Sequence, residues 1–382
     1  MMAGPPLAGI KVLELARILA GPWAGQLLAD LGAEVIKVES PSGDDTRRWG
    51  PPFVENGDGT RDAAYFHAAN RGKRSLAIDF TTPEGQAEVR RLAVEADVLI
   101  ENFKVGGLKK YGLSFDDLAA LNPRLVYCSI TGFGQTGPYA ARAGYDFIVQ
   151  GMSGIMDLTG DPAGPPQKIG VAYADIMTGL YAVTGIQAAL IQRESTGRGQ
   201  HVDAALFDVM VATLANQAMN CLISGKSPQR LGNAHPNIVP YDVYPAADGW
   251  FILATGNDAQ FARVSALLGI APGPHLATNA GRVAARAEVF DMISAATKLS
   301  KRDDLLARLE AAAVPAGPIN SVAEALADPQ IAARGIVRSF AREGGGSVPG
   351  LVTPLHFSAA SLACGAASPQ LDDAHDHRRT FT

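Results

Sequence analysis

The sequence is poor in cysteine. Three cysteines, Cys128, Cys221 and Cys364, lie far apart in a chain of 382 residues. Their odd number and the lack of C-x-x-C spacing give no support to a disulfide framework or a structural zinc site. His67 and His235 also lack a second ligand at metal-binding spacing. We therefore expect buried thiols and no bound metal.

An excess of charge of one sign is also missing. The chain has 33 basic and 38 acidic residues, a formal charge of −5, and no charged tail. No apolar run of about 18 residues stands clear of glycine and polar breaks, as a membrane span would. The opening "MMAGPPLAGIKVLEL" lacks the basic and apolar regions of a signal peptide. The sequence thus predicts a cytoplasmic protein that binds neither nucleic acid nor a membrane.

The order of apolar segments predicts an α/β fold. Short β-branched runs such as "IKVLEL", "EVIKVES" and "RLVYCSITGF" alternate with helical stretches over the first 130 or so residues. Strands separated by helices require crossover connections, which favours a mostly parallel sheet. We expect residues 1–225 to form a large domain, 226–330 a smaller α/β domain, and 331–382 a segment that returns to the large domain.

The first strand–helix–strand unit does not carry a dinucleotide fingerprint. Glu39 ends the second strand about 20 residues after a glycine-rich turn, as such a fingerprint requires. The turn itself reads "LAGPWAG" instead of G-x-G-x-x-G, and Pro22 and Trp23 stand where a backbone would have to approach a pyrophosphate closely. Binding of a nicotinamide cofactor is therefore not favoured.

Two basic groups could bind an anion. The first is Arg71, Lys73 and Arg74 in "NRGKRS", and the second is Lys104, Lys109 and Lys110, which follow Asn102 at the end of "DVLIENF". A solvated turn is the simpler interpretation of such clusters. Asparagine is also common in turns and caps, so Asn102 need not contact a ligand. If the two groups meet in space, they could hold a polyanion through charge-assisted hydrogen bonds.

A single acid, Asp175, stands at the start of the apolar run "GVAYADIMTGLYAVTGIQAAL". The run predicts a helix, and an acid at a helix start commonly caps it or complements its dipole. The same position suits catalysis, because backbone N–H groups there can stabilise an oxyanion and a carboxylate can attack a carbonyl carbon. The pattern alone leaves both roles open.

Several segments together resemble the family III CoA-transferases, a group that includes the α-methylacyl-CoA racemases. They are "LAGPWAGQLLADLGAEVIKVE", "NRGKRSLAIDF", "ADVLIENF", "GLSFDDLAALNPRLVYCSITGFG", "GYDFIVQGMSG", "YADIMTGLYA" and "TGRGQHVDAALFD", in order and at family-like spacing. "ADGWFILATGND" extends the match into the second domain. The resemblance implies a Rossmann-like large domain, a smaller domain, and two chains interlocked as a homodimer.

The resemblance also implies roles for residues at matching positions. Asp175 matches the nucleophilic aspartate, and no cofactor is expected to be permanently bound because coenzyme A is part of the substrate. The positions expected to contact coenzyme A are Ile18, Leu19, Ala20, Arg71, Lys73, Arg74, Asn102, Lys110 and Tyr145.

The implied reaction moves CoA from an acyl-CoA to a free carboxylic acid through an aspartyl-CoA thioester. We expect succinyl-CoA as donor and a small dicarboxylate as acceptor, with Arg17 and His235 as candidates to face a second carboxylate. The family member that acts on formyl-CoA has a glutamine near the position of Leu19 and a glycine run in its second domain. Here the nearest region reads "AHPNIVPY", so oxalate is not expected as acceptor.

Two alternatives differ in chemistry. A racemase needs an acid and a base on opposite faces of the substrate's α-carbon. The racemases carry a histidine where this chain has Tyr145, and a phenol with a pKa of about 10 is a poor base at neutral pH. An inactive CoA-binding homologue is the second alternative, and the intact Asp175 argues against it.

Overall fold

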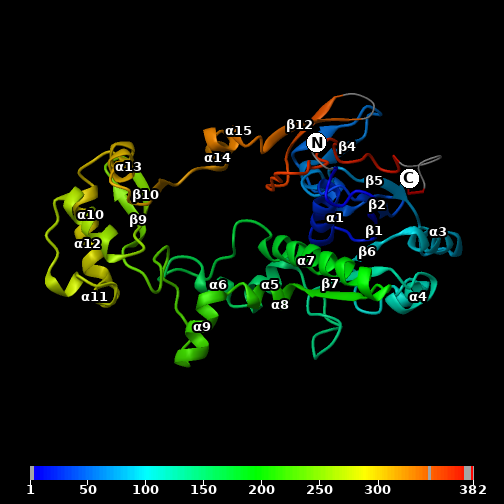
Figure 1. Ribbon diagram of the computed structural model, residues 1–382, viewed down its shortest axis with the longest axis horizontal. Coiled ribbons are helices and arrows are strands. Elements are labelled where there is room, and N and C mark those ends of the chain that lie inside the picture. The colour runs from blue at the N-terminus through cyan, green and yellow to red at the C-terminus, as the bar shows by residue number, and fades with distance from the viewer. Residues whose placement is uncertain (1–3, 343–345, 374–379, 382) are drawn as a thin grey trace. The chain divides into compact units, whose positions relative to one another are not determined.

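Six short strands form one parallel sheet in the computed structural model of this chain (Figure 1). The structure describes residues 4–342, 346–373 and 380–381. The strands are β1 (Lys11–Glu14), β2 (Glu34–Glu39), β5 (Arg74–Ala77), β6 (Val98–Glu101), β7 (Val126–Thr131) and β8 (His201–Ala205). Every pairing in the order β5-β2-β1-β6-β7-β8 is parallel. The predicted α/β fold with a mostly parallel sheet is confirmed.

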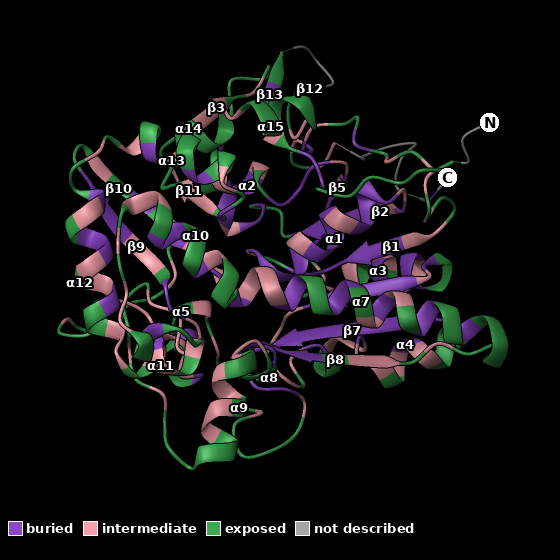
Figure 2. Cartoon of the chain, turned by 60° about the vertical axis from the view of Figure 1, so that its left-hand side comes forward, coloured by how far each residue is buried: buried purple, intermediate pink, exposed green. Residues whose placement is uncertain are grey.

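Helices cover both faces of this sheet, and each face has its own apolar core. On one face α1 (Ala20–Asp30) and α7 (Tyr173–Thr196) bury residues such as Leu28 and Ile186 against the strands. On the other face α3 (Pro83–Glu95) and α4 (Phe115–Leu121) bury Leu92 and Leu118. Figure 2 shows β7 as buried and the edge strand β8 as partly exposed. Burial on both faces explains the apolar runs in the central strands, such as Val98–Ile100 of β6.

The long helix α7 is apolar because it packs in this core. By length and composition it could cross a membrane, as could the bent pair α8 (Leu206–Ala212) and α9 (Ala215–Ser224). However, Ala182, Val183 and Ile186 of α7 are buried within the same cluster as α1 and β7. Core packing therefore accounts for the hydrophobic character of α7.

The strand order reverses direction between β1 and β6. From β1 the chain proceeds outward through β2 to β5, and then returns to pair β6 on the other side of β1. The connections after these two strands leave in opposite directions, which opens a crevice at their carboxyl ends. In doubly wound sheets this is the place where ligands bind.

The chain divides into two compact units. The first consists of Met1–Met156, Lys168–Lys226 and Pro329–Thr382, and the second of Asp157–Gln167 and Ser227–Asp328. From the sequence we placed residues 157–167 in the large domain, whereas in the structure they group with the second unit. Residues of the C-terminal segment contact the first unit, because Asp372 and Asp373 accept hydrogen bonds from the β5 N–H groups of Ala77 and Ser75 at 2.9 and 2.8 Å.

The first unit contains further short elements outside the six-stranded sheet. They are η1 (Asp45–Arg48), β3 (Phe53–Glu55), β4 (Arg61–Ala63), α2 (Ala64–His67), η2 (Lys109–Tyr111), α5 (Asp146–Met152), α15 (Pro329–Ala333), β12 (Val337–Ala341) and β13 (Ser347–Leu351), while α6 (Ile155–Leu158) crosses the boundary between the units.

The second unit is a small α/β structure with its own core. Its strands β9 (Tyr241–Ala246), β10 (Gly249–Ala254) and β11 (Ala316–Pro318) pair antiparallel. The helices are α10 (Asp258–Leu268), η3 (Pro274–Leu276), α11 (Asn279–Ala284), α12 (Arg286–Thr297), α13 (Arg302–Ala311) and α14 (Val322–Leu326). Phe251 and Leu305 are fully buried in a cluster separate from those of the first unit.

Replacing Gly179 by valine should destabilise the contact between α1 and α7. A Cβ at Gly179 would lie 2.8 Å from the Ala20 carbonyl oxygen and 3.1 Å from Trp23 Cδ1. Such overpacking costs about 1–3 kcal/mol of unfolding free energy, which denaturant unfolding measures. Gly170→Ala is the control, because a Cβ there meets nothing within 4 Å. Equal unfolding midpoints for the two variants would contradict this account of the helix contact.

Candidate active site

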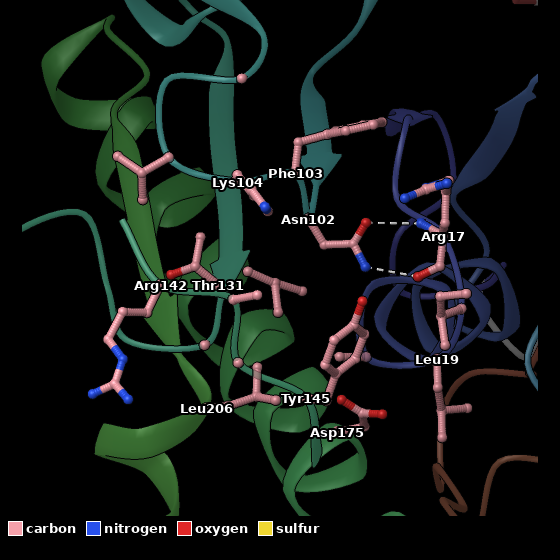
Figure 3. Close-up of a pocket in the computed structure, with 18 of the residues that line it drawn as sticks. Arg17, Leu19, Asn102, Phe103, Lys104, Thr131, Arg142, Tyr145, Asp175 and Leu206 are labelled. Atoms are coloured by element: carbon pink, nitrogen blue, oxygen red, sulfur yellow. Dashed lines mark hydrogen bonds between the residues drawn. The ribbon is translucent and has the colours of Figure 1, made fainter. Parts of the chain in front are cut away.

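A cavity of about 560 Å³ opens at the carboxyl ends of β1, β6 and β7 (Figure 3). The loops that follow these strands form its walls, together with the loop after β5 and the N-terminus of α7. The lining includes residues 17–20, 80–81, 102–105, 130–132 and 142–146, with Asp175 and Leu206. The cavity thus occupies the crevice that the reversal of strand order predicts.

Asn102 joins two of the cavity walls. Its side-chain oxygen accepts the N–H of Arg17 at 2.9 Å, and its side-chain nitrogen donates to the carbonyl oxygen of Arg17 at 2.7 Å. Figure 3 shows both hydrogen bonds, which tie the end of β6 to the turn after β1. Asn102 lines the cavity as expected, and its amide also orders the turn formed by residues 17–20.

Two glycines allow the next wall to form. A Cβ on Gly132, just after β7, would lie 2.4 Å from the Cα of Gly144. Only a residue without a side chain permits backbones to approach this closely. The contact places the following residues, Tyr145 and Asp146, in the lining of the cavity.

Asp146, and not Asp175, caps helix α7. The Asp146 carboxylate accepts hydrogen bonds from the N–H groups of Ala174 at 2.8 Å and Asp175 at 3.3 Å. Gln150 donates to the other oxygen of Asp146 at 2.8 Å and accepts the N–H of Ile169 at 3.0 Å, which fixes both side chains. The Asp175 carboxylate is therefore not needed as a cap, and it lines the cavity near Tyr145 (Figure 3).

The surroundings of Asp175 make it a weak acid. Burial, and then the neighbouring charge of Asp146, raise the pKa of the Asp175 carboxyl to about 7. A carboxyl group with a pKa near neutrality in a cavity is characteristic of functional sites. Sequence reasoning did not single out Asp146, although it lies in the quoted segment "GYDFIVQGMSG".

Basic and aromatic side chains also line the cavity. Lys104, Lys110, Arg17 and Arg142 all line it, and both lysines are exposed. Next to them Phe80 packs edge-on against Phe103 and Tyr111, with ring centroids 5.7 and 5.6 Å apart. Together these side chains offer flexible cations for an anionic ligand and an apolar aromatic surface.

The first basic group is not part of this cavity. Lys73 is fully buried, where its ammonium group donates to Glu14 Oε1, the Pro22 carbonyl oxygen and Asn70 Oδ1, each at 2.9 Å. Arg71 pairs with Asp30, and Arg74 with Glu34, near the amino end of β5. None of these three cations is among the residues that line the cavity.

Arg71, Lys73 and Arg74, which we expected to contact coenzyme A, are thus engaged in ion pairs outside the cavity lining, and the two basic groups do not line this cavity together. Arg71 and Lys73 neutralise the buried carboxylates of Asp30 and Glu14, and Arg74 pairs with the partly exposed Glu34. Sequence reasoning instead missed Phe80, Thr81, Phe103 and Arg142 as lining residues. Phe80 and Thr81 lie in the loop after β5, which ends at Ala77, so their position after a strand was the available signal.

The other predicted residues fall in two places. Ile18, Leu19, Ala20, Lys110, Tyr145 and Asp175 line the cavity, as does Arg17. His235 belongs to the second unit, where its Nδ1 accepts the N–H of Asn237 at 3.1 Å. Within the described ranges 4–342, 346–373 and 380–381, no group of three or more His, Cys, Asp or Glu side chains is arranged to hold a metal ion.

A family model for CoA-transferase family III matches residues 7–375 of this sequence. This chain belongs to CoA-transferase family III. The family resemblance and the prediction of a CoA-transferase are thereby confirmed.

Similar proteins extend over nearly the whole chain. A succinate–glutarate CoA-transferase of Agrobacterium fabrum is 60% identical over 97% of this chain and 94% of its own length. A succinyl-CoA:glutarate CoA-transferase of Homo sapiens is 43% identical over 90% of this chain and 79% of its own length. The crystal structure of a CAIB/BAIF family protein from Brucella suis is 62% identical, with a TM-score of 0.87 over 97% of this chain and 98% of that chain.

The burial of Lys73 predicts that it acts on stability. Lys73→Met removes one of the two cations that contact Glu14 and leaves a buried carboxylate partly unpaired. The free energy of unfolding should fall by about 3 kcal/mol. Lys104→Met, on the exposed rim of the cavity, should unfold close to wild type and serves as the control. Similar unfolding midpoints for Lys73→Met and wild type would contradict this stabilising role and would again favour a ligand contact for Lys73.

Proposed function

We propose that this protein transfers CoA from succinyl-CoA to glutarate or a closely similar dicarboxylate, with Asp175 as the nucleophile. The observation that carries the proposal is the position of the Asp175 carboxylate. Asp146 caps helix α7 in its place, and Asp175 lies in a cavity that is also lined by cations. Membership of CoA-transferase family III and the names of the similar proteins from Agrobacterium fabrum and Homo sapiens support the choice of substrates.

The first half of the reaction forms a covalent enzyme intermediate. A carboxylate oxygen of Asp175 attacks the thioester carbonyl of succinyl-CoA, the C–S bond breaks, and the CoA thiolate leaves a mixed anhydride. The thiolate then attacks the aspartyl carbonyl carbon, and the bond to the succinyl group breaks. Succinate leaves as a carboxylate, and Asp175 is held as an aspartyl-CoA thioester.

The second half repeats these steps with the acceptor. A carboxylate of glutarate attacks the aspartyl thioester and expels the CoA thiolate, which gives a second mixed anhydride. The thiolate attacks the glutaryl carbonyl carbon, and Asp175 leaves as the free carboxylate. No water enters the balance, so the free energy of the thioester is retained. A partly buried nucleophile suits this requirement, because water would hydrolyse each intermediate.

The cavity favours transfer over racemisation. Tyr145 stands at the position at which racemases have their histidine, and no histidine is among the described residues that line the cavity. Proton exchange at an α-carbon requires a second group with a pKa near neutrality on the opposite face. Asp175 supplies one such group, and Tyr145 is a phenol.

We also propose that the protein is an interlocked homodimer in the cytoplasm. Several large apolar side chains of the first unit are exposed in the single chain, including Ile191 of α7 at 74% and Leu222 and Ile223 of α9 at 77% and 80%. A second copy would cover such surface. All three cysteines are free, which suits a reducing compartment. Light scattering on the purified protein tests the dimer, and a monomer mass would exclude it.

Asp175→Asn should abolish transfer of CoA from succinyl-CoA to glutarate, because an amide does not form the anhydride. Removal of a covalent nucleophile costs several powers of ten in kcat. Mass spectrometry of the acyl-CoA products provides the measurement. Glu194→Gln, at the exposed far end of the same helix, should retain full activity. Transfer by Asp175→Asn at a rate near wild type would exclude Asp175 as the nucleophile.

Asp146→Asn should shift the pH dependence of transfer to lower pH. Asp175 attacks as the ionised carboxylate, so kcat/KM should rise with pH through the Asp175 pKa of about 7. Asparagine can still accept the α7 N–H groups but removes the negative charge that helps to raise this pKa. The half-maximal point of the kcat/KM profile should therefore move below that of wild type. An unshifted profile would show that the charge of Asp146 does not act on Asp175.

A further inference from the structure

The turn between β1 and α1 contains a strained residue at the cavity. Ile18 has a φ of 71°, in the left-handed region that β-branched residues rarely adopt. It lines the cavity together with Arg17, Leu19 and Ala20. Strain of this kind persists only where surrounding contacts hold the residue in place. The contacts around Ile18 therefore determine the shape of this cavity wall.

The buried side chains of Asp44 and Lys37 form hydrogen bonds to the backbone of this turn. The Asp44 carboxylate, in the loop after β2, accepts the N–H of Ile18 at 3.2 Å. Lys37, within β2, donates to the carbonyl oxygen of Ala16 at 2.8 Å. Thr46 fixes the other oxygen of Asp44 through its N–H at 3.0 Å and its hydroxyl at 2.8 Å.

Lys37 and Asp44 also form an ion pair with each other. Lys37 Nζ lies 3.0 Å from Asp44 Oδ2, and neither side chain is accessible to solvent. Burial opposes both charges, but the attraction of Glu14 and Asp44 raises the pKa of Lys37, and the attraction of Lys37 lowers the pKa of Asp44. We call Lys37 and Asp44 together the clamp. Both of its side chains are therefore charged at neutral pH, and removal of either charge leaves the other buried with fewer partners.

We propose that Lys37 and Asp44 are positioning residues for the acyl-CoA substrate, which hold Ile18 in its left-handed conformation so that residues 17–20 form the cavity wall. Neither residue is among those that line the cavity, so they act through the turn. The inference rests on the proposed function, because it concerns the binding of the same substrate.

A comparison of two buried aspartates tests this role. Asp44→Asn should raise the KM for succinyl-CoA about tenfold with a smaller change in kcat, because the turn forms part of the cavity wall but supplies no group that reacts. Asp62→Asn is the matched control: Asp62 is also buried, pairs with Arg47 at 3.0 Å and accepts from Asn56 at 3.0 Å, and neither partner belongs to the turn. It should lose stability without a change in KM. Equal KM changes in the two variants would overturn the proposal.

A glycine at position 18 separates positioning from general stability. Glycine adopts positive φ without strain, so it needs less support from Asp44. In an Ile18→Gly background, the effect of Asp44→Asn on KM should shrink to about threefold or less, a coupling that a double-mutant cycle measures. An undiminished effect would show that Asp44 does not act through Ile18.

A milder variant covers the case in which Asp44→Asn does not fold. Thr46→Val keeps the shape of the side chain but removes the hydroxyl that fixes the Asp44 carboxylate. It should raise the KM for succinyl-CoA about threefold, in the same direction as Asp44→Asn. An unchanged KM in this folded variant would overturn the proposal.

Calorimetric titration with coenzyme A distinguishes failure of this inference from failure of the proposed function. If wild-type protein binds coenzyme A but transfers nothing from succinyl-CoA to glutarate, the function is wrong, and weaker binding by Asp44→Asn than by Asp62→Asn still supports the clamp. If transfer proceeds and both variants bind coenzyme A like wild type, the function stands and the clamp is excluded.

Discussion

The parallel pairing of β1 with both β2 and β6 is the constraint on which the site depends. It places the reversal of strand order between β1 and β6 and so opens a crevice at their carboxyl ends. The turn after β1, Asn102 after β6 and the glycine contact after β7 all meet there because parallel strands end at the same edge. The long helix α7 then presents its first turn, with Asp175, to the same space.

Asp146 and Asp175 have different roles at the start of α7, and this difference leaves the Asp175 carboxyl in the cavity with a raised pKa. A helix start attracts a carboxylate through unpaired N–H groups and the dipole, and Asp146 from α5 meets that demand. Asp175 does not cap the helix and lines the cavity, where burial and then the charge of Asp146 raise its pKa. The same contacts that begin helix α7 thus make its first acid available for chemistry.

Buried ion pairs in this chain support the sheet and its turns more than they bind ligand. Lys73, Arg71 and Lys37 are all buried against carboxylates, while the cations that line the cavity, such as Lys104 and Lys110, are exposed and flexible. A cation that already neutralises a buried carboxylate cannot leave it for a phosphate without a large cost. Burial therefore separates structural from ligand-binding cations that look alike in the sequence.

The sequence by itself determined the fold class, the family and the position of Asp175, because alternating strands and helices, ordered motifs and an isolated acid at a helix start are local patterns. Only the tertiary structure decided that the cations of "NRGKRS" pair with carboxylates outside the cavity lining, that Phe80 and Arg142 belong to this lining, and that Asp146 accepts the first N–H groups of α7. These facts depend on strand order and on which edge of the sheet a loop leaves. Such relations join residues far apart in the chain, and no local pattern of residue types records them.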